Sequence, residues 1–194
     1  MTMRKKLLIT IACLSVILCT LVTGTIAWLI DDTQTITNTF TPSNITVELE
    51  ETGTNADNKQ QFQMIPGKTY AKNPTVIVTN DIDSYVFVEV VETNNTWNSK
   101  QVVTYSMGTG WNSLGNGVYY REVSATATEK RFSVLNGDQV VINSDLTKEY
   151  MSGLTADTLY PKLTFTAFAI QKADGGAENG GNFTPAEAWA EINK

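Results

Sequence analysis

Apolar and polar side chains alternate with a period of two residues along most of the chain after residue 44. In the run 45–50, isoleucine, valine and leucine alternate with threonine and glutamate, so an extended strand there has one apolar and one polar face. A strand is predicted at 85–93, and its part 85–91 is apolar on both faces, which is typical of a strand at the centre of a sheet. The same alternation, rich in β-branched and aromatic residues, predicts further strands at 75–79, 102–107, 118–123, 131–135, 139–143 and 162–171.

Helix signals are sparse by comparison. The sequence Thr184-Pro185-Ala186-Glu187 combines a capping box with proline at the first helical position, and it predicts a short helix through Ile192. A further turn of helix is predicted at 146–151 and is ended by glycine. Many short strands separated by turns that contain glycine and asparagine predict an all-β fold. We expect a jelly-roll-like antiparallel β-sandwich over 44–194, with a few short helices, including one at the C-terminus.

The segment 80–84 joins two of the predicted strands. Its sequence, Asn-Asp-Ile-Asp-Ser, predicts a hairpin turn because these side chains make local hydrogen bonds to the backbone. Its carboxylates, Asp81 and Asp83, are also oxygen ligands of the kind that calcium prefers. Calcium is therefore an alternative to the simple turn, and no other metal or cofactor is expected.

The first 27 residues differ in composition from the rest of the chain. Three basic residues within the first six precede an apolar run at 7–22, which is the pattern of a secretory signal peptide. Thr25 and Ala27 are small residues at the −3 and −1 positions, so we place the cut after Ala27 and expect the mature chain to begin at Trp28. The alternative is an uncleaved anchor, because 7–30 is long enough to span a bilayer.

Composition excludes several kinds of chemistry. The chain contains no histidine, and both cysteines, Cys13 and Cys19, lie inside the predicted signal peptide. The mature chain therefore has neither a Ser-His-Asp triad nor the imidazole and thiolate ligands of common zinc sites. It carries 11 basic and 20 acidic residues, a net charge of −9, which argues against nucleic acid as a partner. We expect a protein that is not an enzyme.

The start of the predicted mature chain is unusually apolar for a terminus. On one face of an extended segment, Trp28 and Ile30 are in register with Ile36 and Phe40, and threonines occupy most of the other face. No proline or glycine interrupts the segment before residue 42, so it is able to pair along its length with a sheet edge. Its partner is the subunit's own core, a membrane or another subunit. We expect the segment 28–43 to be a strand that is donated to another subunit.

Several stretches, in this order along the chain, resemble the TasA/camelysin (CalY) family of secreted proteins from Gram-positive bacteria. They are the processing region Gly-Thr-Ile-Ala-Trp-Leu-Ile-Asp-Asp at 24–32, Asn-Thr-Phe at 38–40 and the alternating strand at 45–49. Ile-Pro-Gly-Lys at 65–68, which leads into the strand at 74–80, and the closing strand at 165–171 also resemble that family. The resemblance thus touches both ends and the middle of the chain.

This resemblance implies a jelly-roll sandwich that polymerises into extracellular biofilm-matrix fibres by donating an N-terminal strand to the next subunit. It also implies a dedicated SipW-type signal peptidase, an accessory matrix or nucleating protein as a further partner, and a location in the matrix or at the cell surface.

Two other functions stay open at this point. The same family carries a metallopeptidase label, although this chain offers only carboxylates, hydroxyls, lysine and tyrosine for such chemistry. Four aromatic residues among Asn, Ser and Gly are typical either of carbohydrate-binding loops or of the core and rim of a sandwich. They are Trp97, Trp111, Tyr119 and Tyr120.

Overall fold

The alternating runs fold into strands that pair antiparallel throughout the part of the chain that the computed structural model describes, which is residues 3, 43–53, 60–173 and 181–194. These strands are β1 (Ile45–Glu50), β2 (Thr69–Ala71), β3 (Thr75–Asn80), β4 (Ser84–Thr93), β5 (Thr96–Trp97), β6 (Lys100–Gln101), β7 (Val103–Thr104), β8 (Asn112–Gly115), β9 (Val118–Val123), β10 (Arg131–Ser133), β11 (Gln139–Ile142) and β12 (Lys162–Gln171). The helical elements are η1 (Asn136–Asp138), α2 (Lys148–Gly153), η2 (Asp157–Leu159) and α3 (Pro185–Ile192).

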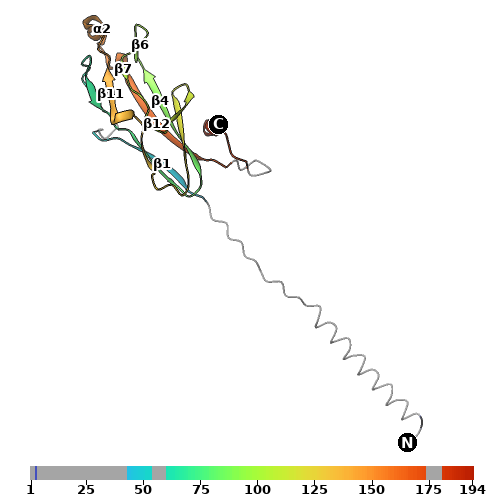
Figure 1. The fold of residues 1–194 in the computed structure, drawn as a ribbon. Helices are drawn as coiled ribbons and strands as arrows, with labels where there is room; N and C mark the ends of the chain where they lie inside the picture. The colour runs from blue at the N-terminus through green and yellow to red at the C-terminus, as the bar shows by residue number, and fades with distance from the viewer. Residues whose placement is uncertain (1–2, 4–42, 54–59, 174–180) are drawn as a thin grey trace. The chain divides into compact units, whose positions relative to one another are not determined.

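The larger sheets form the two layers of a sandwich (Figure 1). One layer has the strand order β12-β4-β9-β8, and the other consists of β1-β3-β10 and β2-β11-β7. A small β5-β6 ribbon extends from the end of β4. The prediction of an all-β antiparallel sandwich with a helix at the C-terminus is therefore confirmed.

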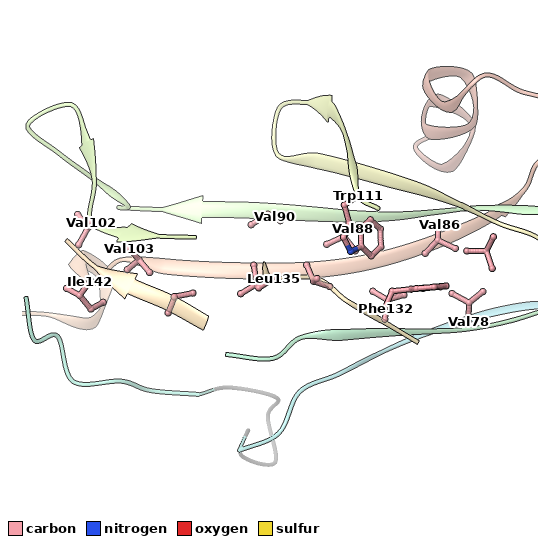
Figure 2. Packing of buried hydrophobic residues seen from close by; sticks show 14 of the residues in the cluster. Val78, Val86, Val88, Val90, Val102, Val103, Trp111, Phe132, Leu135 and Ile142 are labelled. Carbon is pink, nitrogen blue, oxygen red and sulfur yellow. The ribbon is translucent and has the colours of Figure 1, made fainter. Parts of the chain in front are cut away.

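The main core lies between these layers, as Figure 2 shows. Alternate residues of β4 point into it because a strand turns successive side chains to opposite faces. Val86, Val88 and Val90 of β4 meet side chains of β3, β10 and β11, and all of these positions are at most 9% exposed. The facing residues are Val76, Val78, Phe132, Val140 and Ile142.

A second apolar cluster lies on the outer face of β4, beneath α3. Phe87 is fully buried there, and the Trp189 ring of α3 packs against it with 5.3 Å between ring centroids. Trp189 also meets Phe168 of β12 edge-on at 5.3 Å. The capping box forms as predicted, since Thr184 and Glu187 exchange hydrogen bonds. This helix explains why Tyr85 and Phe87, on the face of β4 that points away from the main core, are apolar.

The hairpin predicted at 80–84 is wrong. β3 pairs with β1 and β10, whereas β4 pairs with β12 and β9, so the chain crosses from one layer to the other at this point. Turn-forming residues suit either connection, and the pairing of distant strands decides between them.

Some predicted elements are shorter or displaced. The strand predicted at 102–107 is reduced to β7. Met107 forms an isolated antiparallel bridge with Leu135 and does not continue the pairing of β7 with β11. The strand predicted at 131–135 stops at residue 133 as η1 approaches. The helix predicted at 146–151 occupies Lys148–Gly153, because the Thr147 side chain caps it by accepting from the Tyr150 N–H.

Candidate functional site

The residues predicted for processing and assembly lie outside the described part of the chain. They are Thr25, Ala27, Trp28, Ile30, Ile36 and Phe40. The described chain reaches β1 through Ser43 and Asn44, so β1 is the element next to the predicted donor segment. The site can therefore be built from β1 and its neighbours.

Asp81 fixes the beginning of β1. Its Oδ1 atom accepts a hydrogen bond from the Asn44 N–H at 2.8 Å, and its own N–H donates to the Asn44 carbonyl at 3.2 Å. This reciprocal pair ties the point at which the chain enters the sandwich to the β3–β4 crossover.

Asp83 serves a different loop. Its Oδ1 atom accepts from the Ala125 N–H at 2.8 Å and from the Ser124 hydroxyl at 3.0 Å. The Ala125 hydrogen bond, with smaller help from Ser124 and Lys172, holds the pKa of this carboxyl below its usual value. Asp83 is thus an ionised carboxylate that organises the loop after β9.

The crossover already contains a cation. The Lys130 ammonium donates to the Asn80 side chain, to the Asn80 carbonyl at 2.9 Å and to the Ala125 carbonyl at 3.1 Å. These are oxygens of the type that calcium would need. The described residues include no group of three or more His, Cys, Asp or Glu side chains placed to hold a metal ion. Asp81 and Asp83 thus accept hydrogen bonds from backbone N–H groups, although these groups belong to segments distant in the sequence. The segment 80–84 is a crossover between layers and not a hairpin.

Two edge strands lie side by side next to this crossover. Within the described residues β1 pairs only with β3, and β12 pairs only with β4, so each has one side of its backbone outside a ladder. The two strands belong to different layers but are in contact, and β12 is ten residues long. Such edges present unpaired N–H and C=O groups to an added strand. We call this pair of strands the β1–β12 edge.

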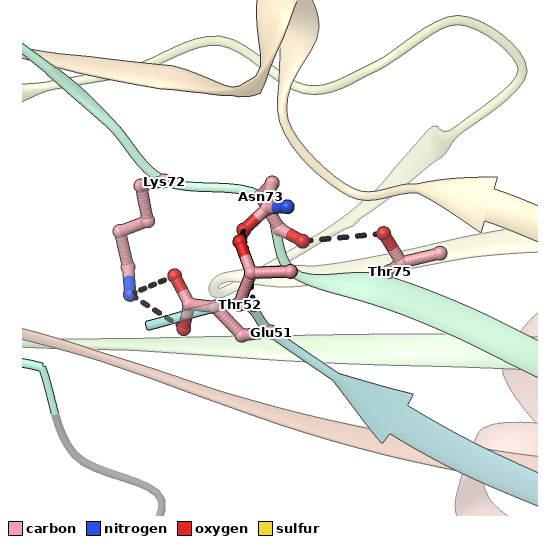
Figure 3. Close-up of polar contacts among 5 residues, drawn as sticks. All are labelled: Glu51, Thr52, Lys72, Asn73 and Thr75. Atoms are coloured by element: carbon pink, nitrogen blue, oxygen red, sulfur yellow. Dashed lines mark hydrogen bonds and ion pairs between the residues drawn. The ribbon is translucent and has the colours of Figure 1, made fainter. Parts of the chain in front are cut away.

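A largely buried ion pair fixes the far end of β1 (Figure 3). The Lys72 ammonium lies 2.9 and 3.0 Å from the two carboxylate oxygens of Glu51, and these side chains are 11% and 14% exposed. The ammonium also lies 5.2 Å from the ring centroid of Phe165 on β12. The adjacent Thr52 donates from its hydroxyl and its N–H to the Asn73 side-chain oxygen, at 2.9 and 3.2 Å. β1 is thus held at both ends and against β12.

The carboxyl groups with a shifted pKa in the described residues bear on the enzyme alternative. Burial opposes ionisation of Glu92, but hydrogen bonds from Tyr105, Asn95 and Gln101 lower its pKa overall. The pKa values of Asp83, Asp145 and Glu187 are lowered too, by loop, ion-pair and helix-cap contacts respectively. A general acid at neutral pH needs a raised pKa. The shifted carboxyls therefore have the character of structural groups.

The four aromatic residues considered for carbohydrate binding occupy packing positions. Trp111 is 9% exposed, and its indole N–H donates to the Ser133 carbonyl at 2.8 Å. Trp97 packs on Tyr150 with 5.5 Å between ring centroids. Tyr119 packs against the main core and Tyr120 against the cluster beneath α3. Core and rim packing accounts for their presence.

The sequence interpretation did not single out Arg121. This residue shares the inner face of β9 with Tyr119 and Val123, so its charge points toward the core at the β10 side of the sandwich. The signal was available, because one cation interrupts an otherwise apolar face of a predicted strand, but its surroundings depend on distant segments. It lines a hollow of about 330 Å³.

Comparisons with known proteins do not identify the chain. No protein-family model matches the sequence, and no curated protein matches it at a significant level. Among the described residues there is no helix of the length and apolar character needed to cross a bilayer. The resemblance drawn from the motifs stays a prediction.

Proposed function

We propose that this protein is a secreted structural subunit that polymerises with its own copies into fibres of an extracellular matrix. The observation that supports this most is the β1–β12 edge, where two edge strands in contact each have one side of the backbone without a ladder partner in the described residues. The segment 28–43, with its alternating apolar face and no glycine, directly precedes this edge in the chain. One subunit would supply the extended segment, and the next would supply a sheet edge.

The energetics favour a donated strand over a free terminus. Trp28, Ile36 and Phe40 would each gain about 1.5–3 kcal/mol on full burial, in addition to the main-chain hydrogen bonds of an added strand. The contact is head-to-tail, so it propagates into a filament instead of closing as a dimer. A donated strand needs a rigid edge strand to pair with. β1 is held in place by Asp81 at one end and by the Glu51–Lys72 pair at the other.

The biological setting of the proposal comes from the motif resemblance. In that setting a SipW-type signal peptidase cuts after Ala27, and the fibre forms at the surface or in the matrix of a Gram-positive bacterium. An accessory matrix or nucleating protein is the second proposed partner.

Substitutions on the two faces of the donor segment test this proposal. In the chain that begins at Trp28, the triple substitution Trp28→Ser, Ile36→Ser and Phe40→Ser should abolish sedimentable polymer. Its matched control changes three threonines of the opposite face to serine, at 33, 35 and 37, and should sediment like the unchanged chain. Equal sedimentation of both triple variants would overturn strand donation through this face.

A further inference from the structure

The β10 edge of the sandwich contains the hollow that Arg121 lines. β10 is the opposite edge of the β1-β3-β10 sheet, and the hollow lies between β10, η1 and the loop before β8. Its volume of about 330 Å³ is at the lower end of small-ligand sites. The polar side chains around it are Thr109, Arg121, Arg131, Ser133, Asn136 and Asp138.

The guanidinium of Arg121 is held by aromatic stacking. Its central carbon lies 3.6 Å from the ring centroid of Phe132 and 5.2 Å from that of Trp111. Gly110, at φ +86°, allows this placement, because a Cβ atom there would come within 2.7 Å of a terminal guanidinium nitrogen. Packing therefore fixes the plane of the group.

The donors of Arg121 are not used by the described protein. Its Nε atom is buried without a hydrogen-bond partner. Burial lowers the pKa of Arg121, and the nearby Glu129 carboxylate partly opposes this shift without taking a hydrogen bond from the guanidinium among the described contacts. A guanidinium has five N–H donors, and buried donors normally have partners. A guanidinium that is held by aromatic stacking and whose N–H groups lack acceptors can bind a planar anion.

The rest of the lining indicates which anion fits. Arg131 lies at the rim, where it pairs with Glu50 at 3.1 Å. Asp138, whose carboxylate accepts from the Ser133 hydroxyl, adds a negative charge to the lining. That charge disfavours a dianionic phosphate but can accept hydrogen bonds from ligand hydroxyls. Hydroxyl and amide groups of Thr109 and Asn136 complete a lining suited to a hydroxylated monoanion.

We propose that this hollow binds an acidic sugar, with the carboxylate of a hexuronate on Arg121 and the sugar hydroxyls on Asn136 and Asp138. The carboxylate accepts two parallel hydrogen bonds from the guanidinium, the bidentate geometry that a fixed guanidinium plane favours. Arg131 supplies a second positive charge at the rim. The site is independent of strand donation. It would let an assembled or a monomeric subunit hold acidic polysaccharide.

The purified protein can be titrated with galacturonate, with galactose as the neutral sugar, while the side-chain Nε–Hε resonance of Arg121 is followed by NMR. Galacturonate should shift this resonance saturably, whereas galactose should not. Arg121→Gln should weaken galacturonate binding at least tenfold, and Asn136→Ala, at an exposed turn away from the core, should weaken it several-fold. Lys100→Gln, which removes an exposed cation outside the hollow, should leave binding unchanged.

Other probes give the outcomes that would overturn the proposal. The proposal fails if galacturonate gives no saturable shift, if galactose gives an equal response, or if both Arg121→Gln and Asn136→Ala leave the affinity unchanged. Arg121 would then be only an inward-pointing charge that keeps the adjacent sheet edge from pairing with another chain. Tighter binding of inorganic phosphate or of an aspartate-containing peptide than of galacturonate would assign the hollow to a different anion and refute the sugar.

Discussion

Replacement of Lys72 by methionine tests whether β1 is anchored as the structure indicates. The change removes the ammonium that lies 2.9 Å from Glu51 but keeps an apolar stem of similar length over Phe165. Glu51 then loses this cation at a position where its side chain is only 14% exposed. We expect the free energy of unfolding to fall, because a largely buried carboxylate would be left with less compensation.

The magnitude follows from the distances and the burial. Two unit charges about 3 Å apart attract by roughly 5 kcal/mol at an effective dielectric constant of about 20, and desolvation of both groups offsets part of this. We therefore expect Lys72→Met to cost about 3 kcal/mol, and Glu51→Leu to cost a similar amount. The double variant should cost much less than the sum, with a coupling energy of about 2–3 kcal/mol, because it leaves no buried charge behind.

Urea denaturation of the chain that begins at Asn44, which should stay monomeric, measures these changes by linear extrapolation. The matched control is Lys100→Met, which breaks an ion pair whose side chains are 60% and 56% exposed and should leave the midpoint unchanged. A Lys72→Met variant as stable as this control, or single effects that simply add, would refute the anchoring argument.

Three further predictions concern other parts of the molecule. Trp189→Ala should lower the free energy of unfolding by about 3 kcal/mol and expose the C-terminus to proteolysis, since Trp189 joins α3 to Phe87; unchanged protease resistance would contradict this. Because folding lowers the pKa of Asp83, its stabilisation is present at neutral pH and is lost as pH falls through the folded pKa. The stability difference between the unchanged chain and Asp83→Asn should thus shrink below about pH 4 in urea titrations, and a constant difference would count against it. Purified protein should contain no stoichiometric zinc and should not cleave casein. This prediction would be wrong if the purified protein cleaved casein in a chelator-sensitive way and the double variant with Asp81→Ala and Asp83→Ala did not.

Local chemistry was enough to predict the fold class and several elements. The period-two alternation at 45–50 and 162–171 gave β1 and β12 with their observed bounds, and the Thr184 capping box gave the start of α3. The run 85–93 was expected at the centre of a sheet and does lie between β12 and β9. In each case the signal is carried by neighbouring residues and by the requirement to bury one face.

Features set by distant contacts could not be predicted in this way. Asn80–Ser84 is a crossover because β3 and β4 find partners in different layers, and the turn residues carry no information on that choice. Strands of two to four residues, such as β5, β6 and β8, are too short to show a period. The pairing of Lys72 with Glu51 and the stacking of Arg121 on Phe132 depend on segments brought together only by the fold.

The central claim is that the segment 28–43 joins subunits and is not needed to fold one. Negative-stain electron microscopy of two purified chains, one beginning at Trp28 and one at Asn44, tests it most directly, with circular dichroism to report folding. We predict filaments from the longer chain, and from the shorter chain a folded β protein that stays monomeric. Filaments of the same morphology from the chain that begins at Asn44, or its failure to fold, would contradict the account.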